Sequence, residues 1–245
     1  DSVEAMYNLG VIYEYGQLGL EHNIETAVKY YEKGSAKEDA DCMINLGCIL
    51  EQSEEYPHDY ARAFELYLKA AEQGNGRAYN NLGTCYKRAI GTAKDAKKAI
   101  ECYEKAIEKG CQEGYWNLYL YYMDEVCTPR DFTKAVEWLK KGDQADVLQC
   151  TYQLTKHYMH GDGVESDARK YFECLYKASN QGYEEAYNEL GNCYKYGVGT
   201  EQDGSSAFEW YQKAASASIE GVWNLANCYI YAISKEKDDK KAVEL

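Results

Sequence analysis

Apolar positions along the chain follow one pattern that returns every 35 to 37 residues. A leucine, usually within Asn-Leu-Gly, marks each of seven repeats: Leu9, Leu46, Leu82, Leu118, Leu154, Leu190 and Leu225. A small residue lies four positions before this leucine and a bulky residue four positions after it, as in Ala78, Leu82 and Tyr86. Residues four apart share one face of an α-helix, so each leucine is predicted to lie at the centre of an amphipathic helix, here called the A helix.

A second apolar pattern, Ala-x-x-x-Tyr-x-Lys-Ala, follows the first and predicts a B helix antiparallel to it, for example over residues 63–70 and 99–106. Four repeats place a glycine directly after the leucine: Gly10, Gly47, Gly83 and Gly191. Glycine lowers helix propensity, so its recurrence inside a helix predicts close approach of another helix there.

The loops between A and B helices carry glycines and an aspartate, most clearly in residues 160–167 and 196–203. The glycines are expected at positive φ, and Asp167 and Asp203 are expected to cap the following helix. With Leu-Gly-x-x-Tyr before them and Trp-Tyr-Gln-Lys-Ala-Ala after the second, these loops closely resemble those of the Sel1-like repeat family, which is related to tetratricopeptide repeats. Repeat 4 departs most, with Tyr119 for the glycine and a different loop over residues 125–129.

The resemblance covers the whole chain and implies an all-α fold, a right-handed superhelical solenoid of antiparallel helix pairs. About six and a half repeats of 36 residues would form a single solenoid over residues 1–245. The chain begins at Asp1 without a methionine and stops at Leu245 within a repeat, so we expect a fragment of a longer polypeptide. Uncapped end repeats would expose apolar faces, and self-association through them is expected.

The formal net charge of −14 disfavours nucleic acid and anionic membranes as partners, because such binding rests on Lys and Arg. The acidity also opposes a helical-repeat RNA binder, which the similar period of pentatricopeptide arrays would suggest. No apolar run approaches the length of a transmembrane helix, so direct membrane insertion is not expected.

Ten cysteines could indicate disulfides, but several recur at equivalent core positions of different repeats: Cys85, Cys193 and Cys228, then Cys42 and Cys150, then Cys102 and Cys174. This recurrence favours small apolar packing residues with reduced thiols. No Asn-x-Ser/Thr acceptor occurs. We therefore expect a cytoplasmic protein, with the lumen of the endoplasmic reticulum as the alternative.

The chain has no Walker A sequence and no His-Glu-x-x-His, so these common catalytic motifs are absent. Cys150, His157 and His160 offer metal-ligand chemistry, but two of them fall at core positions of the repeat, so no metal is expected. The sequence predicts neither an enzyme nor a cofactor.

On each A helix, positions two before, two after, five after and six after the leucine share the face that the apolar stripe leaves free. In tetratricopeptide-like arrays this face lines the concave groove, so the resemblance implies a protein-binding groove there. Its expected lining residues are Asn80, Thr84, Lys87, Arg88, Trp116, Lys156, His160, Asn188, Asn192, Lys195, Tyr196, Trp223 and Asn227. Amides can bond to a peptide backbone, aromatic rings can anchor it and cations can meet carboxylates, so an extended acidic segment is the expected ligand.

Members of the resembled family commonly act as adaptors, which implies a protein-interaction scaffold within a multiprotein complex. The alternative is a regulatory repeat region of a larger polypeptide that carries an enzyme or kinase domain. The residues of this chain leave both possibilities open.

Overall fold

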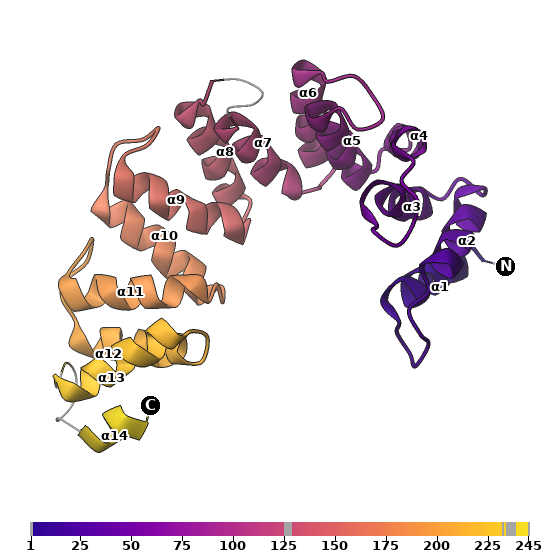
Figure 1. Ribbon diagram of the computed structural model, residues 1–245. Coiled ribbons are helices and arrows are strands. Elements are labelled where there is room, and N and C mark those ends of the chain that lie inside the picture. Colours follow the sequence, from indigo (N-terminus) through magenta and orange to yellow (C-terminus); the bar gives the residue numbers. More distant parts are fainter. Residues whose placement is uncertain (1, 125–128, 232, 234–238, 245) are drawn as a thin grey trace. The chain divides into compact units, whose positions relative to one another are not determined.

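The computed structural model describes residues 2–124, 129–231, 233 and 239–244, and in these ranges every regular element is an α-helix (Figure 1). The A helices are α1 (Val3–Tyr15), α3 (Ala40–Gln52), α5 (Gly76–Arg88), α7 (Glu113–Met123), α9 (Leu148–His160), α11 (Glu185–Tyr196) and α13 (Ile219–Ile230). The B helices are α2 (Ile24–Ser35), α4 (Tyr60–Glu72), α6 (Ala96–Glu108), α8 (Phe132–Gln144), α10 (Ala168–Asn180), α12 (Gly204–Ala215) and α14 (Asp239–Glu244). The all-α class and the helix pairs predicted from the repeat are confirmed.

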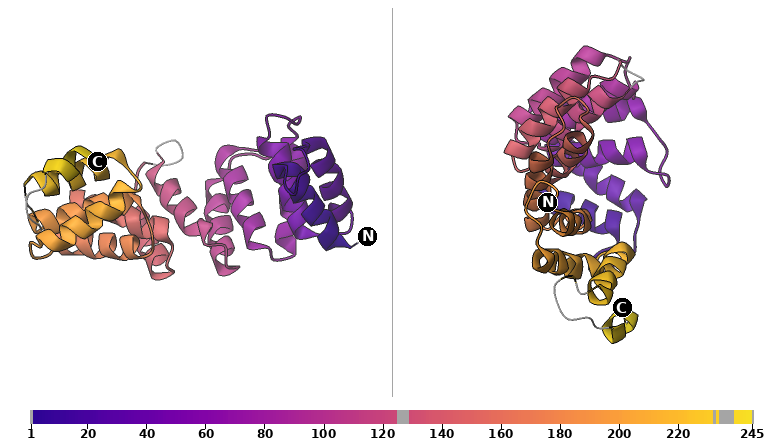
Figure 2. Two further views of the ribbon diagram at one scale, coloured as in Figure 1. Left: turned by 90° about the horizontal axis from the view of Figure 1, so that it is seen from below. Right: turned by 90° about the vertical axis from the view of Figure 1, so that its left-hand side faces the viewer.

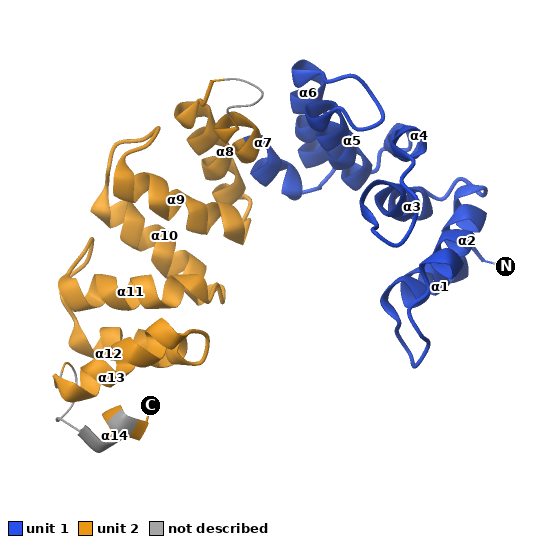
Figure 3. Ribbon diagram, in the orientation of Figure 1, with its two compact units in different colours: residues 1–118 blue, residues 119–245 orange. Residues whose placement is uncertain are grey.

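The chain forms two compact units, Asp1–Leu118 and Tyr119–Leu245, and the boundary falls inside α7 (Figure 3). Within each unit, an A helix packs against its own B helix, and that B helix packs against the next A helix (Figure 2). Among the described residues, no helix is both long and apolar enough to cross a membrane.

The glycine after the repeat leucine packs against the tyrosine ring of its B helix. A Cβ atom added at Gly83 would lie 2.6 Å from the ring of Tyr103, and one at Gly191 would lie 2.7 Å from the ring of Tyr211. Carbon atoms in ordinary contact are about 3.5–4.0 Å apart, so any side chain at these glycines would displace the tyrosine ring. The close approach predicted from the recurring glycine is confirmed.

Repeats 4 and 5 change both members of this pair. Tyr119 and Thr155 take the glycine position, and Leu139 and Leu175 take the tyrosine position of their B helices. All four side chains are buried. A larger residue on the A helix therefore accompanies the loss of the aromatic ring on the B helix, as conservation of packed volume requires.

The aspartate at the end of each of these A–B loops, Asp167 or Asp203, forms hydrogen bonds with both helices that the loop joins. The Asp203 carboxylate accepts hydrogen bonds from the backbone N–H groups at the start of α12, 2.9 Å from that of Ser205 and 3.2 Å from that of Ser206. The Asp203 N–H in turn donates to the carbonyl of Tyr194 at 2.9 Å. Asp167 is bonded in the same way, and backbone hydrogen bonding lowers the pKa of its carboxyl. The predicted caps are confirmed.

The glycines of the same loops have positive φ, as predicted. Gly163 and Gly199 have φ of 73° and 70°. A Cβ atom at Gly199 would strike the carbonyl oxygen of Ala168, the first residue of the preceding B helix, so this glycine lets the loop pack against the previous repeat. The repeat 4 loop, over residues 125–128, lies outside the described residues.

Most described cysteines belong to the core. Nine are free, and Cys42, Cys85, Cys150, Cys193 and Cys228 are buried, as their repeat positions predicted. Cys102 and Cys174 are half-buried, and Cys127 lies outside the described residues. Burial raises the pKa of Cys85 and Cys193 to about 12, so these thiols hold little reactive thiolate near neutral pH.

We predict that all ten cysteines carry thiols in never-reduced protein. Thiol titration should find ten reactive groups after unfolding, and far slower reaction of the buried ones before it. A deficit of two or more thiols in the unfolded sample would show that disulfides form and would contradict a reducing compartment.

The glycine–tyrosine contact predicts a rescue between repeats. Gly83→Thr alone should lower the free energy of unfolding by about 1–3 kcal/mol, because the added atoms collide with the Tyr103 ring. Adding Tyr103→Leu, which copies the Thr155–Leu175 pair, should recover part of this loss, with a coupling of about 0.5–3 kcal/mol in a double-mutant cycle. Simple additivity of the two changes in urea unfolding would argue against the paired packing.

Candidate functional site

The thirteen residues expected in a groove all lie on A helices. Unit 1 carries those on α5 and α7: Asn80, Thr84, Lys87, Arg88 and Trp116. Unit 2 carries those on α9, α11 and α13: Lys156, His160, Asn188, Asn192, Lys195, Tyr196, Trp223 and Asn227. Among them, the rings of Tyr196 and Trp223 are each 65% exposed.

Two of the expected amides join neighbouring A helices. The Asn80 side-chain oxygen accepts a hydrogen bond from Asn117 at 2.7 Å, and that of Asn188 accepts one from Asn224 at 2.8 Å. Asn188 is also buried. The sequence led us to expect these amides to contact a ligand. In the structure, their side-chain oxygens accept hydrogen bonds that join successive repeats.

The residue directly before the repeat leucine supplies these links, and sequence reasoning missed it. Gln153 donates to the Tyr119 hydroxyl at 2.8 Å, and Asn45 donates to the Tyr31 hydroxyl at 3.2 Å. The recurring asparagine of Asn-Leu-Gly was a visible signal of this role. The members of this position in repeats 2 to 7 are Asn45, Asn81, Asn117, Gln153, Glu189 and Asn224.

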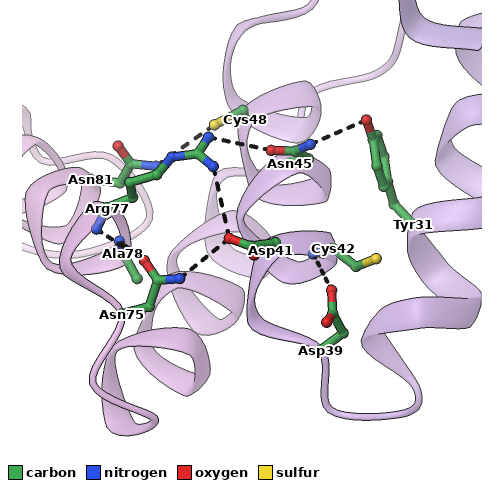
Figure 4. Close-up of polar contacts among 10 residues, drawn as sticks. All are labelled: Tyr31, Asp39, Asp41, Cys42, Asn45, Cys48, Asn75, Arg77, Ala78 and Asn81. Atoms are coloured by element: carbon green, nitrogen blue, oxygen red, sulfur yellow. Dashed lines mark hydrogen bonds and ion pairs between the residues drawn. The ribbon is translucent and has the colours of Figure 1, made fainter. Parts of the chain in front are cut away.

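Figure 4 shows this position within unit 1, where Asn45 of α3 lies between two repeats. Its amide nitrogen bonds to Tyr31 of α2, and its oxygen lies 3.5 Å from an Arg77 nitrogen of α5. Arg77 also forms an ion pair with Asp41 at 3.8 Å. Polar contacts of this kind position successive A helices of the unit relative to one another.

A cavity of about 530 Å³ opens in unit 2 where residues of the A helices α9, α11 and α13 come together. The side of the unit formed by these helices is here called its A-helix face. Its lining residues are Tyr158, Met159, Ser166, Ala168, Tyr171, Glu189, Asn192, Cys193, Tyr196, Val198, Glu220, Trp223 and Asn224. Three residues expected from the sequence are among them: Asn192, Tyr196 and Trp223. Met159, 58% exposed, and Val198, 39% exposed, add apolar surface that the sequence did not reveal.

The charged residues that line this cavity are Glu189 and Glu220. Both Glu189 carboxylate oxygens accept tyrosine hydroxyls, from Tyr152 at 2.7 Å and from Tyr171 at 3.2 Å. Burial raises the pKa of both tyrosines, which keeps their hydroxyls protonated as donors. The Nζ of Lys195, which was expected to supply positive charge, lies 4.9 Å from the centre of the Tyr196 ring.

The histidines of α9 do not form a metal site with Cys150. His157 is buried, its Nδ1 lies 2.8 Å from the carbonyl oxygen of Asp162, and its ring contacts Tyr119 edge-on. Across the described residues, no group of three or more histidine, cysteine, aspartate or glutamate side chains is placed to hold a metal ion.

The repeat pattern also matches a known family model, the Sel1 repeat, over residues 3–39, 40–75, 76–111, 114–142, 149–183, 184–218 and 219–245. The chain belongs to the Sel1 repeat family. Proteins built of Sel1 repeats generally act as protein-interaction scaffolds. A comparison with curated proteins found no match to this Sel1 repeat protein.

Solved structures of other Sel1 repeat proteins share the fold. The c5321 antigen, described as a protective antigen of uropathogenic Escherichia coli strains, superposes with a TM-score of 0.79 at 24% identity over 99% of this chain. A Sel1 repeat protein from Oxalobacter formigenes gives 0.75 at 25% identity over 91% of this chain. The present chain covers 52% and 65% of these two proteins, respectively.

A hollow of about 440 Å³ in unit 1 of this Sel1 repeat protein is lined by residues of α1, α2, α3 and α5 and by loop residues that include His22 and Glu55. The His22 Nδ1 lies 2.6 Å from the carbonyl oxygen of Glu14, and its Nε2 lies 2.7 Å from a Glu55 carboxylate oxygen. Both partners only accept hydrogen bonds, so both ring nitrogens must carry protons to satisfy them. The hydrogen bond to Glu55 accordingly raises the pKa of His22 above its usual value.

We predict that Glu55→Gln lowers the pKa of His22, measured by NMR titration of its ring protons, and that Glu54→Gln leaves it unchanged. Because the folded-state pKa is raised, the contact stabilises unit 1 fully below the unfolded-state pKa of about 6.5 and is lost as pH rises through the folded value. An identical His22 titration in the Glu55→Gln variant would show that the pair does not form.

Proposed function

We propose that this protein is a non-enzymatic scaffold that binds an extended segment of another protein on the A-helix face of unit 2. The observation that carries the proposal is the cavity of about 530 Å³ with Tyr196 and Trp223 at its surface, each 65% exposed. Exposed apolar surface that gathers at a hollow is typical of interaction sites. Tryptophan and tyrosine are also the side chains that most often dominate binding energy at protein interfaces.

The architecture of the site supports a peptide rather than a reacting small molecule. The Asn192 side-chain oxygen accepts the Tyr211 hydroxyl at 2.7 Å, which holds the amide at the cavity wall. A side-chain amide held in this way can bond to the backbone of an extended chain through its NH₂ group. The carboxylate of Glu189 is held by two tyrosines and belongs to the packing.

We also propose that the corresponding face of unit 1 contacts a protein partner. Lys87 and Arg88 lie at the end of α5, and Thr84 on that helix lies 3.2 Å from the Tyr103 hydroxyl. In unit 1, these residues offer a partner two cations and a hydroxyl group. In unit 2, the main contact groups are the rings of Tyr196 and Trp223. The proposal includes a cytoplasmic location, which the buried free thiols support.

Selection of linear peptides from a random displayed library tests the proposal on the full chain. Trp223→Ala and Tyr196→Ala should each lower the affinity for the enriched peptides about tenfold or more, as loss of an anchor side chain does. Tyr176→Ala is the matched control, because Tyr176 is an exposed tyrosine of unit 2 on the B helix α10. The melting temperature should stay nearly constant in all three variants, since the side chains lie at the surface.

Two results would refute the proposal. One is failure of any linear peptide to enrich against the folded chain. The other is loss of binding in Tyr176→Ala with full binding in Trp223→Ala, which would place the working surface on the B helices.

A further inference from the structure

Unit 2 has another hollow, which is acidic and adjoins the cavity of about 530 Å³. Its volume is about 510 Å³, and its lining residues are Tyr152, Glu184, Glu185, Asn188, Glu189, Ala217, Ser218 and Glu220. Glu189 and Glu220 line both hollows. An apolar cavity and a carboxylate-lined cavity therefore share a wall.

The glutamates that line the acidic hollow differ in their hydrogen bonding and in their exposure to solvent. Glu189 is bonded to Tyr152 and Tyr171 and holds its orientation. Glu184, Glu185 and Glu220 are exposed. Carboxylates at this surface can accept hydrogen bonds from arginine or lysine, and arginine can bond two carboxylate oxygens at once.

Nearby cations do not change the sign of this surface. Lys156 lies over the Tyr152 ring at 5.6 Å and Lys195 lies over the Tyr196 ring at 4.9 Å. Four glutamates line the acidic hollow, on a chain with a formal charge of −14. The local field therefore favours a cationic ligand and disfavours the acidic segment expected from the sequence.

Resting on the function proposed above, we infer that unit 2 binds a protein segment in which a large apolar side chain is closely followed or preceded by arginine or lysine. The apolar side chain occupies the cavity beside Trp223 and Met159, and the cation meets Glu184 and Glu220 in the adjoining hollow. An extended chain advances about 3.3 Å per residue, so a few residues suffice to join neighbouring hollows. The aromatic contacts set the residence time, and the carboxylates select the charge of the partner.

Two libraries of displayed 12-residue peptides test the inference with the full chain. Both randomise a central block over large apolar residues, and the flanking positions are fixed as arginine in one library and as glutamate in the other. The arginine library should yield binders that weaken in Trp223→Ala and at high salt. Binding should fall about fivefold or more in the double variant Glu184→Gln, Glu220→Gln, which removes two exposed charge contacts.

The matched control is the double variant Glu137→Gln, Glu209→Gln, which makes the same charge change at exposed positions of the B helices α8 and α12. Its binding should stay within about twofold of wild type, since distant surface charges are screened. Equal melting temperatures of the two double variants exclude unfolding as the cause of any difference.

The outcomes separate this inference from the proposed function. Binders from the glutamate library alone that still depend on Trp223 would overturn the basic segment and leave the binding surface in place. Equal loss of binding in both double variants would also overturn the specific role of Glu184 and Glu220. If peptides from either library bind Trp223→Ala as tightly as they bind the wild type, the proposed binding surface itself would be wrong.

Discussion

The packing of a B-helix tyrosine ring against the bare backbone of an A-helix glycine is the contact on which repeats 1, 2, 3 and 6 depend. Gly10, Gly47, Gly83 and Gly191 each face such a ring. The contact sets the distance between the two helices, and it requires the residue pair to change together, as Thr155 and Leu175 do. Because every repeat has to bury its face against its neighbours, an error in this distance would be passed along the array.

The same tyrosines connect the core to the surface that is proposed to bind. Each ring lies in the core, whereas its hydroxyl reaches the A-helix face: Tyr67 donates to Glu51 at 2.9 Å and Tyr211 donates to Asn192 at 2.7 Å. The polar groups of that face are thereby held in place before any ligand arrives. A surface organised in this way loses less side-chain entropy on binding than a surface of free side chains.

The sequence predicted the features that arise within one repeat: the helix pairs, the aspartate caps, the glycines at positive φ and the close glycine contact. It did not predict features that depend on neighbouring repeats. Spacing along one helix placed Asn80 and Asn188 on the right face, but the amides that occupy their oxygens come from residues 37 and 36 positions away. Likewise, Glu220 was not among the expected site residues, because the cavity that it lines is built by residues from several repeats. The periodicity of a single sequence therefore predicts packing within a repeat far better than it predicts contacts between repeats.

The central claim, that ligands bind on the A-helix face of unit 2, can be tested directly through the indole N–H signals of the four tryptophans. A peptide obtained by selection would be titrated into ¹⁵N-labelled protein. The claim predicts that the signal of Trp223 on α13 shifts or broadens with saturation while that of Trp138 on the B helix α8 stays in place. A saturating shift of Trp138 with an unchanged Trp223 signal would contradict it.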